Sequence, residues 1–387
     1  MSSRQNNNAS VFIIGAGPSG LALAACLKSK NIAFQLIDNK GVVGGAFNHM
    51  YEYMRMASPA RYMSLPGLTL KHDSEYIRAG EYLRYLRQYA AHFDLSVQAV
   101  QVRHVEPANK DGEGFLVYSQ QLTDEACDSF ANSGGKRHVQ RYVVLATGMF
   151  DTPVYADELK SVMRDPPLGL TVIHAHDWRG VEQWQGKSVL LLGSATSAVD
   201  IAEEFAAAGQ LVHVSTRSGR FNSIPQRVLG RDIHDMLVPL ARLPRWLLRR
   251  HCRHYYESDA PSARPHSEPA THVALYRYLG EGLIKLVGPL TSINGRLVGC
   301  GNDFVREFDV IISATGYRYN YDYLRFGMDV EDVLADFDRG ESKTWPGLFL
   351  MGKGCVFGRP SQFIWGIAHD AKRLATIISS RIDRASH

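Results

Sequence analysis

The chain has 387 residues, more than one ordinary hydrophobic core accommodates, which indicates two lobes. With 45% hydrophobic residues, 21% charged residues and a net charge of +4, its composition is that of a soluble globular protein without a nucleic-acid-binding arm. We expect no transmembrane helix, since no stretch approaches ~20 uninterrupted apolar residues. The five scattered cysteines contain no C-x-x-C pair, which suits a reducing cytoplasm and excludes the usual dithiol centre of a flavin disulfide reductase.

Residues 11–38 have the pattern of a dinucleotide-binding βαβ unit: an apolar strand, glycines in the G-x-G-x-x-G spacing, a helix and a second apolar strand. Gly15 permits the tight turn, Gly17 leaves the backbone open to a pyrophosphate, and Gly20 lets the helix pack closely on the strand. Asp38 ends the second strand, where its carboxylate can accept hydrogen bonds from both ribose hydroxyls. Because an acid there disfavours a 2′-phosphate, the ligand is expected to be FAD or NAD.

Residues 41–67 follow as a long irregular segment with many aromatic residues, methionines and arginines. Ordered loops of this length are more often functional than idle. The segment is similar to the G-G-x-W-x-x-x-x-Y-x-x-L-R-L-x-[ST]-P run of class B flavin-dependent monooxygenases, which include flavin-containing, Baeyer–Villiger and plant auxin-forming enzymes. Phe47 stands where many members have tryptophan, and Tyr51 stands at the tyrosine position. The pattern is kept at Gly44, Gly45, Arg55, Ser58, Pro59, Leu65, Pro66 and Gly67.

The next segments predict a helix and a group of short strands. Residues 74–96 have apolar residues at helical spacing, and their aromatic stripe favours core packing over a cofactor contact. Residues 97–149 predict several short strands, and the polar insert at 123–136 predicts a hairpin extension. The sequence Ala146-Thr147-Gly148 after them is similar to the A-T-G linker between the two lobes of this superfamily.

His174 and Trp178 match the F-x-G-x-x-x-H-x-x-x-[WY] fingerprint of the resembled family, although Leu168 and Leu170 replace its Phe and Gly. In the family this segment links and orients the lobes. We therefore interpret His174 as a structural or gating residue in preference to a general base.

Residues 187–218 predict a second βαβ unit. Its phosphate turn begins at Gly193 and is similar to the family's G-x-G-x-S-A, but Ala195 places a methyl group where the backbone approaches the pyrophosphate. The second strand ends without an acid. Arg217 stands there instead, and its guanidinium suits a 2′-phosphate, which favours NADPH over NADH. A degenerate lobe that binds no nucleotide is the alternative.

The C-terminal part resembles the returning flavin segment. A strand ends in the sequence A-T-G-Y at 314–317, similar to the motif by which these enzymes return to the FAD domain, and Gly352 lies where related flavoproteins approach the ribityl chain. A helix is expected to begin near Gln362, with its positive end facing the flavin. The basic stretch 238–256 is interpreted as a solvated helix near a substrate entrance or a partner contact, with a membrane-surface helix as the alternative.

The resemblance implies an α/β fold with two Rossmann-like dinucleotide-binding domains. Residues 1–160 and 300–387 are expected to form the FAD domain, and residues 161–299 the inserted NADPH domain. The implied activity is an NADPH- and O₂-dependent monooxygenase that oxygenates a small organic substrate at nitrogen, at sulfur or by Baeyer–Villiger chemistry, through a flavin hydroperoxide. Two other functions stay open: an NADPH-dependent flavin reductase or oxidase, with Cys355 as its candidate redox thiol, and a non-enzymatic nucleotide-binding scaffold.

The expected partners are a small-molecule substrate and O₂, with no nucleic acid, no metal and no membrane span; the protein is expected to be cytoplasmic, and a homodimer stays open. The candidate catalytic residues are Ser58, His174 and Gln362. The expected FAD-binding residues are Gly15, Gly17, Pro18, Ser19, Gly20, Asp38, Gly45, Phe47, Arg55, Ser58, Gly352 and Gln362. The expected NADPH-binding residues are Gly193, Ser194, Thr196, Ser197, Arg217, Thr315 and Gly316.

Overall fold

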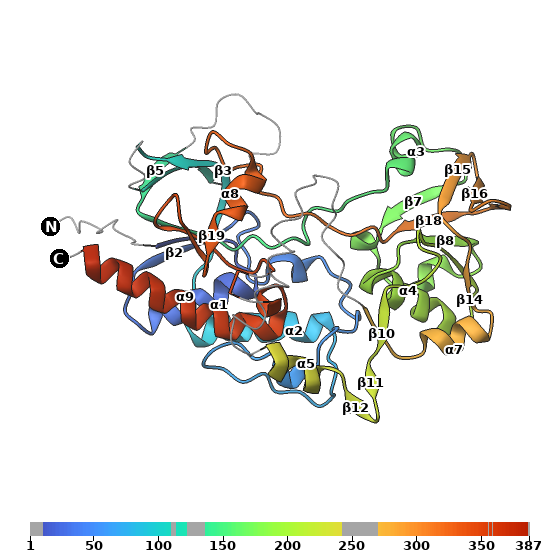
Figure 1. Ribbon diagram of the computed structural model, residues 1–387, viewed down its shortest axis with the longest axis horizontal. Coiled ribbons are helices and arrows are strands. Elements are labelled where there is room, and N and C mark those ends of the chain that lie inside the picture. The colour runs from blue at the N-terminus through green and yellow to red at the C-terminus, as the bar shows by residue number, and fades with distance from the viewer. Residues whose placement is uncertain are drawn as a thin grey trace.

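Two lobes lie side by side in the computed structural model, and extended segments connect them (Figure 1). The first and the last described elements, strand β1 (Val11–Ile14) and helix α9 (Ile364–Ala385), both belong to the first lobe, so this lobe is built from both ends of the chain. The structure describes residues 11–109, 114–121, 136–241, 270–354, 356–357 and 359–385.

The first lobe is built on a nine-stranded sheet of order β19-β20-β21-β6-β1-β2-β3-β4-β5. At its centre β1 (Val11–Ile14) pairs in parallel with β2 (Phe34–Asp38) and with β6 (Tyr142–Leu145). Every residue of β1 and β6 is buried, as expected for parallel strands covered on both faces. The other strands are β3 (Gln98–Pro107), β4 (Phe115–Gln121), β5 (Lys136–Gln140), β19 (Phe337–Asp338), β20 (Glu341–Ser342) and β21 (Leu348–Leu350).

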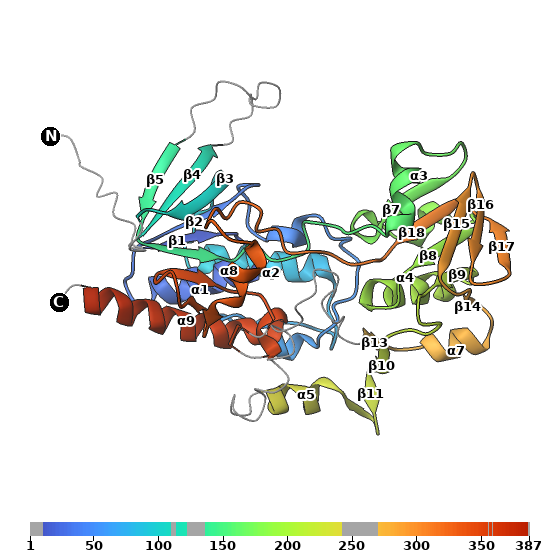
Figure 2. The ribbon, with the colours of Figure 1, turned by 45° about the horizontal axis from the view of Figure 1, so that its top comes forward.

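The helices of the first lobe cover the sheet with apolar side chains. Helix α1 (Pro18–Lys28) begins with proline, whose fixed φ suits the first turn, and α9 (Ile364–Ala385) packs along it (Figure 2). The helix expected at 74–96 is α2 (Ala79–His92), and its buried tyrosines confirm the expected core packing. The shorter helices are α8 (Val330–Ala335) and the 3₁₀ turns Gly45–Asn48, Ala60–Tyr62 and Arg359–Gln362.

The second lobe contains a five-stranded parallel sheet of order β14-β9-β8-β18-β7. Side chains of β8 alternate between two cores: Val189 and Leu191 pack with residues of α4, and Leu190 and Leu192 pack with residues of the antiparallel strands β15 to β17. Both faces are covered, which explains the uninterrupted apolar run. The strands are β7 (Thr171–His174), β8 (Val189–Leu192), β9 (Val212–Ser215), β14 (Ile284–Leu286), β15 (Leu290–Asn294), β16 (Leu297–Cys300), β17 (Phe304–Glu307) and β18 (Val310–Ser313); the helices are α3 (Lys160–Arg164), α4 (Thr196–Ala207) and α7 (Leu275–Gly280). Short 3₁₀ turns cover Asp157–Leu159, Ala175–Asp177 and Val181–Trp184.

The chain leaves the second lobe later than the boundary expected at residue 300. Strand β18 lies between β8 and β7, with Val310 opposite Val189 and Thr171. The second sheet therefore includes the chain up to Ser313, because β18 supplies the strand that joins β7 to the rest of that sheet. We retain the three-segment division as a proposal, with the return moved to the A-T-G-Y sequence that follows β18.

Residues 222–241, called here the interlobe arm, reach from the second lobe to the first. Asp235 at the start of α5 accepts hydrogen bonds from the guanidinium of Arg61 at 2.8 Å and from the hydroxyl of Tyr62 at 2.6 Å, and Tyr76 donates to Asp232. The arm comprises β10 (Ser223–Pro225), which pairs with β13 (Ala270–His272), then β11 (Arg227–Val228), β12 (Arg231–Asp232) and α5 (His234–Ala241). Most of the basic stretch expected at 238–256, and the hairpin insert expected at 123–136 apart from its last residue, lie outside the described residues. None of the helices in the described part of the chain has the length and apolar character needed to cross a membrane.

Candidate functional site

The three glycines of the turn after β1 differ in how much room the protein leaves for a side chain. A Cβ atom at Gly15 would lie 2.5 Å from the carbonyl oxygen of Ala146, and one at Gly20 would lie 1.9 Å from the carbonyl oxygen of Gly15, so protein packing excludes a side chain at both. A Cβ at Gly17 would meet no protein atom within 4 Å. Packing therefore does not require glycine there, whereas a pyrophosphate lying against the backbone does. The turn fits the dinucleotide expected from the sequence.

Asp38 is buried beside this turn and holds its backbone. Its Oδ2 accepts a hydrogen bond from the amide of Ala16 at 2.9 Å, and its Oδ1 accepts one from the amide of Lys40 at 2.9 Å. A carboxylate offers about four lone-pair sites, so it retains capacity for ribose hydroxyls. Asp38 thus fixes the turn and remains suited to the expected ribose contact.

Segments far apart in the chain converge at the start of α1, which Pro18 opens. A Cβ at Gly45 would lie 3.0 Å from the Cα of Gly17, and a Cβ at Gly352 would lie 2.8 Å from the Oγ of Ser19. The tertiary structure therefore brings together the expected FAD residues of three different segments: the first glycine turn, the paired glycines and the C-terminal flavin segment.

The remaining expected FAD residues lie farther along the same segments. Phe47 contacts the ring of Tyr82 edge-on, with the ring centroids 5.1 Å apart, and Ser58 is buried. Gln362 ends the 3₁₀ turn that precedes α9, close to where a helix was expected to begin. Ser361 fixes that turn, since its buried hydroxyl accepts a hydrogen bond from the amide of Phe357 at 3.1 Å. Flavin contacts of these residues stay predictions.

Arg55 has a different environment from the one its motif suggested. Its Nη2 donates to Oε1 of Gln226 in the interlobe arm at 2.5 Å, and its guanidinium lies over the ring of Tyr76, 3.9 Å from the centroid. Arg55 therefore joins the first lobe to the arm. A direct role in holding FAD stays a prediction.

The phosphate turn of the second lobe repeats only part of the first. Gly193 has φ +141°, and a Cβ there would lie 2.4 Å from the carbonyl oxygen of Ala314, so glycine is required. Ala195 is the N-cap of α4 in an extended conformation that alanine adopts without strain. The methyl group of Ala195 is thus compatible with the protein itself, and any cost arises only when a nucleotide approaches.

The residues around this turn connect it to the arm and to the helix. The carbonyl of Ser194 accepts a hydrogen bond from the amide of Asn222 at 2.8 Å, and Thr196 and Ser197 begin α4. Backbone amides at a helix N-terminus suit an anion. The expected pyrophosphate contacts at Ser194, Thr196 and Ser197 therefore lie at one helix end.

Arg217 is exposed just after β9, and its guanidinium makes no ion pair or hydrogen bond with the described residues. The neighbouring Thr216 hydroxyl is buried without a hydrogen-bond partner in the same described set. An exposed cation at this strand end, unpaired within the described part of the chain, suits the 2′-phosphate expected from the sequence.

His174 is fully buried at the end of β7, with both ring nitrogens engaged. Its Nδ1 accepts a hydrogen bond from the amide of His176 at 3.0 Å, so its Nε2 carries the proton and donates to the carbonyl of Gly316 at 3.1 Å. Burial, the largest cause, lowers the pKa of His174 to about 4. A neutral ring held at both nitrogens is suited to joining the lobes and unsuited to general-base catalysis.

The two linkers between the lobes run side by side near this histidine. The hydroxyl of Thr315 donates to the carbonyl of Val154, and the amide of Val154 donates to the carbonyl of Gly316 at 2.9 Å. Thr315 and Gly316 therefore hold the linkers together. Their expected contacts with NADPH stay predictions.

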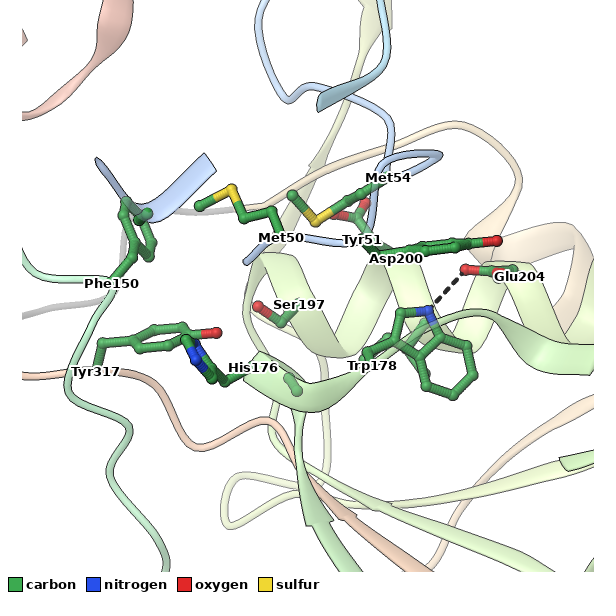
Figure 3. Close-up of a pocket in the computed structure, with 13 residues that line it drawn as sticks. Met50, Tyr51, Met54, Phe150, His176, Trp178, Ser197, Asp200, Glu204 and Tyr317 are labelled. Atoms are coloured by element: carbon green, nitrogen blue, oxygen red, sulfur yellow. Dashed lines mark hydrogen bonds between the residues drawn. The ribbon is translucent and has the colours of Figure 1, made fainter. Parts of the chain in front are cut away.

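A pocket opens between the lobes (Figure 3), with a cavity volume of about 80 Å³ inside a wider depression whose about 630 Å³ of empty space includes open solvent. Ala46 on its wall follows Gly45 of the FAD segment, and Ser197 on the opposite wall belongs to the second phosphate turn. A small ligand here would thus lie between the two expected dinucleotide sites. The lining residues are Ala46, Met50, Tyr51, Met54, Phe150, Ala175, His176, Trp178, Ser197, Asp200, Ile201, Glu204 and Tyr317.

Sequence reasoning did not identify the acids of this pocket. Asp200 and Glu204 project from successive turns of α4, and Glu204 accepts hydrogen bonds from Nε1 of Trp178 at 3.0 Å and from the amide of Val181 at 3.2 Å (Figure 3). The only signal in the sequence is the spacing of four residues, which places both acids on one helix face. Nothing in it says that this face meets the other lobe.

Comparisons with known proteins agree with this arrangement. A family model described as pyridine nucleotide-disulphide oxidoreductase matches residues 12–240. The indole-3-pyruvate monooxygenase YUCCA8 of Oryza sativa subsp. japonica is 27% identical, and the match covers 96% of this chain and 90% of that protein. A variant of the flavin monooxygenase from Stenotrophomonas maltophilia has a similar structure, with a TM-score of 0.72 at 20% identity over 96% of this chain and 98% of that one. The bacillithiol disulfide reductase Bdr from Bacillus cereus has a TM-score of 0.66 at 19% identity over 96% and 99%. These matches confirm the expected fold class.

Proposed function

Because this chain belongs to the pyridine nucleotide-disulphide oxidoreductase family, we propose that it is an NADPH- and O₂-dependent flavoprotein monooxygenase acting on a small organic substrate. Family and relatives bear out the expected oxidoreductase that uses FAD and NADPH, and they support the resemblance to class B flavin monooxygenases. Oxygen transfer itself, and a cytoplasmic location, belong to the proposal.

The two glycine turns would hold the two dinucleotides. The turn at Gly15 to Gly20, with Asp38, Gly45 and Gly352 around it, suits FAD, and the turn at Gly193 with Arg217 suits NADPH. Bound FAD supplies the redox chemistry, as acceptor of a hydride and activator of O₂. The observation that carries the proposal is the position of the pocket, between the turn that suits FAD and the turn that suits NADPH.

The chain itself would orient the substrate and exclude water. Met50, Met54, Phe150 and Tyr317 form much of the pocket wall (Figure 3), and these bulky side chains limit the access of water to the reacting atoms. Per turnover, one substrate, one O₂, one NADPH and one proton would yield one oxygenated product, NADP⁺ and one water. One oxygen atom enters the product, and the other leaves as water.

The test follows the oxygen atoms. The purified FAD-loaded protein is supplied with NADPH and ¹⁸O₂, and amines, sulfides and ketones are screened by mass spectrometry. We expect one ¹⁸O atom per product molecule and one NADPH consumed per product. Conversion of all consumed O₂ into hydrogen peroxide, with every substrate screened, would contradict the proposal.

Stoichiometric peroxide release would instead support a flavin reductase or oxidase without oxygen insertion. The fold similarity to a disulfide reductase is the observation that favours this second candidate. Its candidate thiol, Cys355, lies outside the described residues. In that case Cys355→Ser should abolish turnover while FAD stays bound, and unchanged turnover would exclude a Cys355 mechanism.

A further inference from the structure

The carboxylate of Asp200 lines the pocket between the lobes. Among the residues that the structure describes, none donates a hydrogen bond to it. The neighbouring acids of α4 are occupied: Glu203 accepts from the amide of Ala274 at 2.6 Å, and Glu204 accepts from Trp178. Asp200 is therefore the acid of α4 whose acceptor capacity is left for a ligand in the pocket.

The cations near the pocket are turned to other partners. The guanidinium of Arg55 donates to Gln226, and Nη1 of Arg179 donates to the carbonyls of His176 and Trp178. Among the described residues, those that line the pocket include no lysine or arginine. A substrate carboxylate in this pocket would face the acids Asp200 and Glu204 without a lysine or arginine to pair with. Binding a carboxylate there is unfavourable, because the environment is partly buried.

The charge state of Asp200 suits a ligand that donates a hydrogen bond. Burial, Glu203 and Glu204 raise the pKa of Asp200 to about 7, while Arg55 opposes the rise. Above that pH the carboxylate is charged and would accept a strong hydrogen bond from an N–H group. Ligation by such a group recovers the cost of keeping the charge away from water.

The opposite wall suits the rest of such a molecule. Met50 and Met54 from the first lobe and Phe150 and Tyr317 from the linkers face α4 across the pocket (Figure 3). Thioether and aromatic groups are polarisable and pack well on an apolar or aromatic body, and aromatic faces also attract a cation. The pocket therefore combines an apolar wall with one unpartnered acceptor.

We propose that Asp200 determines the substrate specificity of this pocket: it accepts a hydrogen bond from a nitrogen-borne donor of the substrate and excludes substrates that carry a carboxylate at that end. The inference rests on the proposed function and deepens it. On this proposal the chain does not accept indole-3-pyruvate, the substrate named for its plant relatives, because that molecule carries a carboxylate.

The test compares ligands that share one skeleton. Binding of 2-phenylethylamine, 2-phenylethanol and 3-phenylpropionate to the full FAD-loaded chain is measured by calorimetry at pH 8 with saturating NADP⁺. We expect the amine to bind at least tenfold more tightly than the carboxylate. Asp200→Asn should reduce this ratio at least tenfold, and Asp200→Glu, which keeps the charge, should retain most of it. Asp303→Asn removes the same charge from an exposed site outside the pocket and should leave the ratio unchanged.

Equal binding of amine and carboxylate, an unchanged ratio in Asp200→Asn, or an amine that binds only when NADP⁺ is left out would each overturn the proposal. Asp200→Ser provides a second uncharged variant if Asp200→Asn does not fold. Binding requires no oxygen transfer, so charge preference without ¹⁸O in any product would contradict the monooxygenase function alone. Incorporation of ¹⁸O without charge preference would contradict only the role of Asp200.

Discussion

Replacement of Gly17 by alanine tests whether position 17 is glycine because a cofactor lies against it or because protein packing requires it. A Cβ there would meet no protein atom within 4 Å, and the backbone has φ −76°, which alanine adopts freely. Substituting glycine at a compatible position stabilises a protein by ~0.4–1 kcal/mol through the unfolded chain. The unfolding midpoint of Gly17→Ala without cofactor should therefore equal or slightly exceed that of the wild type.

FAD binding by the same variant should weaken. The added methyl group stands where the pyrophosphate is expected to meet the backbone, and forcing a methyl into a close contact costs ~1–3 kcal/mol. That cost corresponds to a rise in the Kd for FAD of roughly 5- to 150-fold.

Gly20→Ala is the matched control, because it adds the same methyl group within the same turn. Its Cβ would lie 1.9 Å from the carbonyl oxygen of Gly15, so this variant should lose stability even without FAD. The assay combines fluorescence titration of the apoprotein with FAD and chemical unfolding followed by circular dichroism. Wild-type FAD affinity in Gly17→Ala would refute the assignment of Gly17 to a pyrophosphate contact.

Other predictions test the second nucleotide site and the buried ionisable groups. Ala195→Gly should lower the Kd for NADPH about fivefold or more, because it removes a methyl group worth ~1 kcal/mol of crowding from the phosphate turn; an unchanged Kd would mean that the nucleotide does not approach there. Arg217→Ala should raise the KM for NADPH about tenfold and leave that for NADH unchanged, and equal effects on both would argue against a 2′-phosphate contact. The pKa of His174 falls from 6.5 to about 4 on folding, so the neutral ring contributes ~3 kcal/mol to the free energy of unfolding. This contribution should be complete above pH 6.5 and be lost as the pH falls toward 4. His174→Gln should flatten the pH dependence, as measured by urea unfolding at pH 7.5 and 4.5. Asp370 is buried with its pKa raised to about 7, chiefly by burial, and its Oδ2 has no hydrogen-bond partner among the described residues. Its charge therefore costs stability as the pH rises from about 4 to 7, so Asp370→Asn should stabilise the protein by up to about 4 kcal/mol at pH 8 and by little at pH 4, and a gain independent of pH would contradict this cause.

Local sequence patterns were sufficient where a structure depends on residues close together in the chain. The two βαβ units, their glycine turns and the amphipathic helix α2 were all predicted, because strand and helix periodicity and glycine conformation act over a few tens of residues. The role of Gly20 is an example, since its contact is with Gly15 in the same turn. The resemblance to class B flavin monooxygenases added the expectation that these turns bind FAD and NADPH.

Only the tertiary structure decided which distant segments meet. The structure places β18 between β8 and β7, which moves the expected domain boundary at residue 300. The sequence could not show this, because any apolar strand of similar length is compatible with that position in a parallel sheet. The contact of Arg61 with Asp235 joins residues 174 positions apart, and nothing in either local sequence signals it. Asp200 is likewise one acid on an amphipathic helix until the first lobe packs opposite it and leaves it half-buried in the pocket. The sequence by itself therefore determined the dinucleotide turns, and the packing of the two lobes decided which side chains surround the substrate.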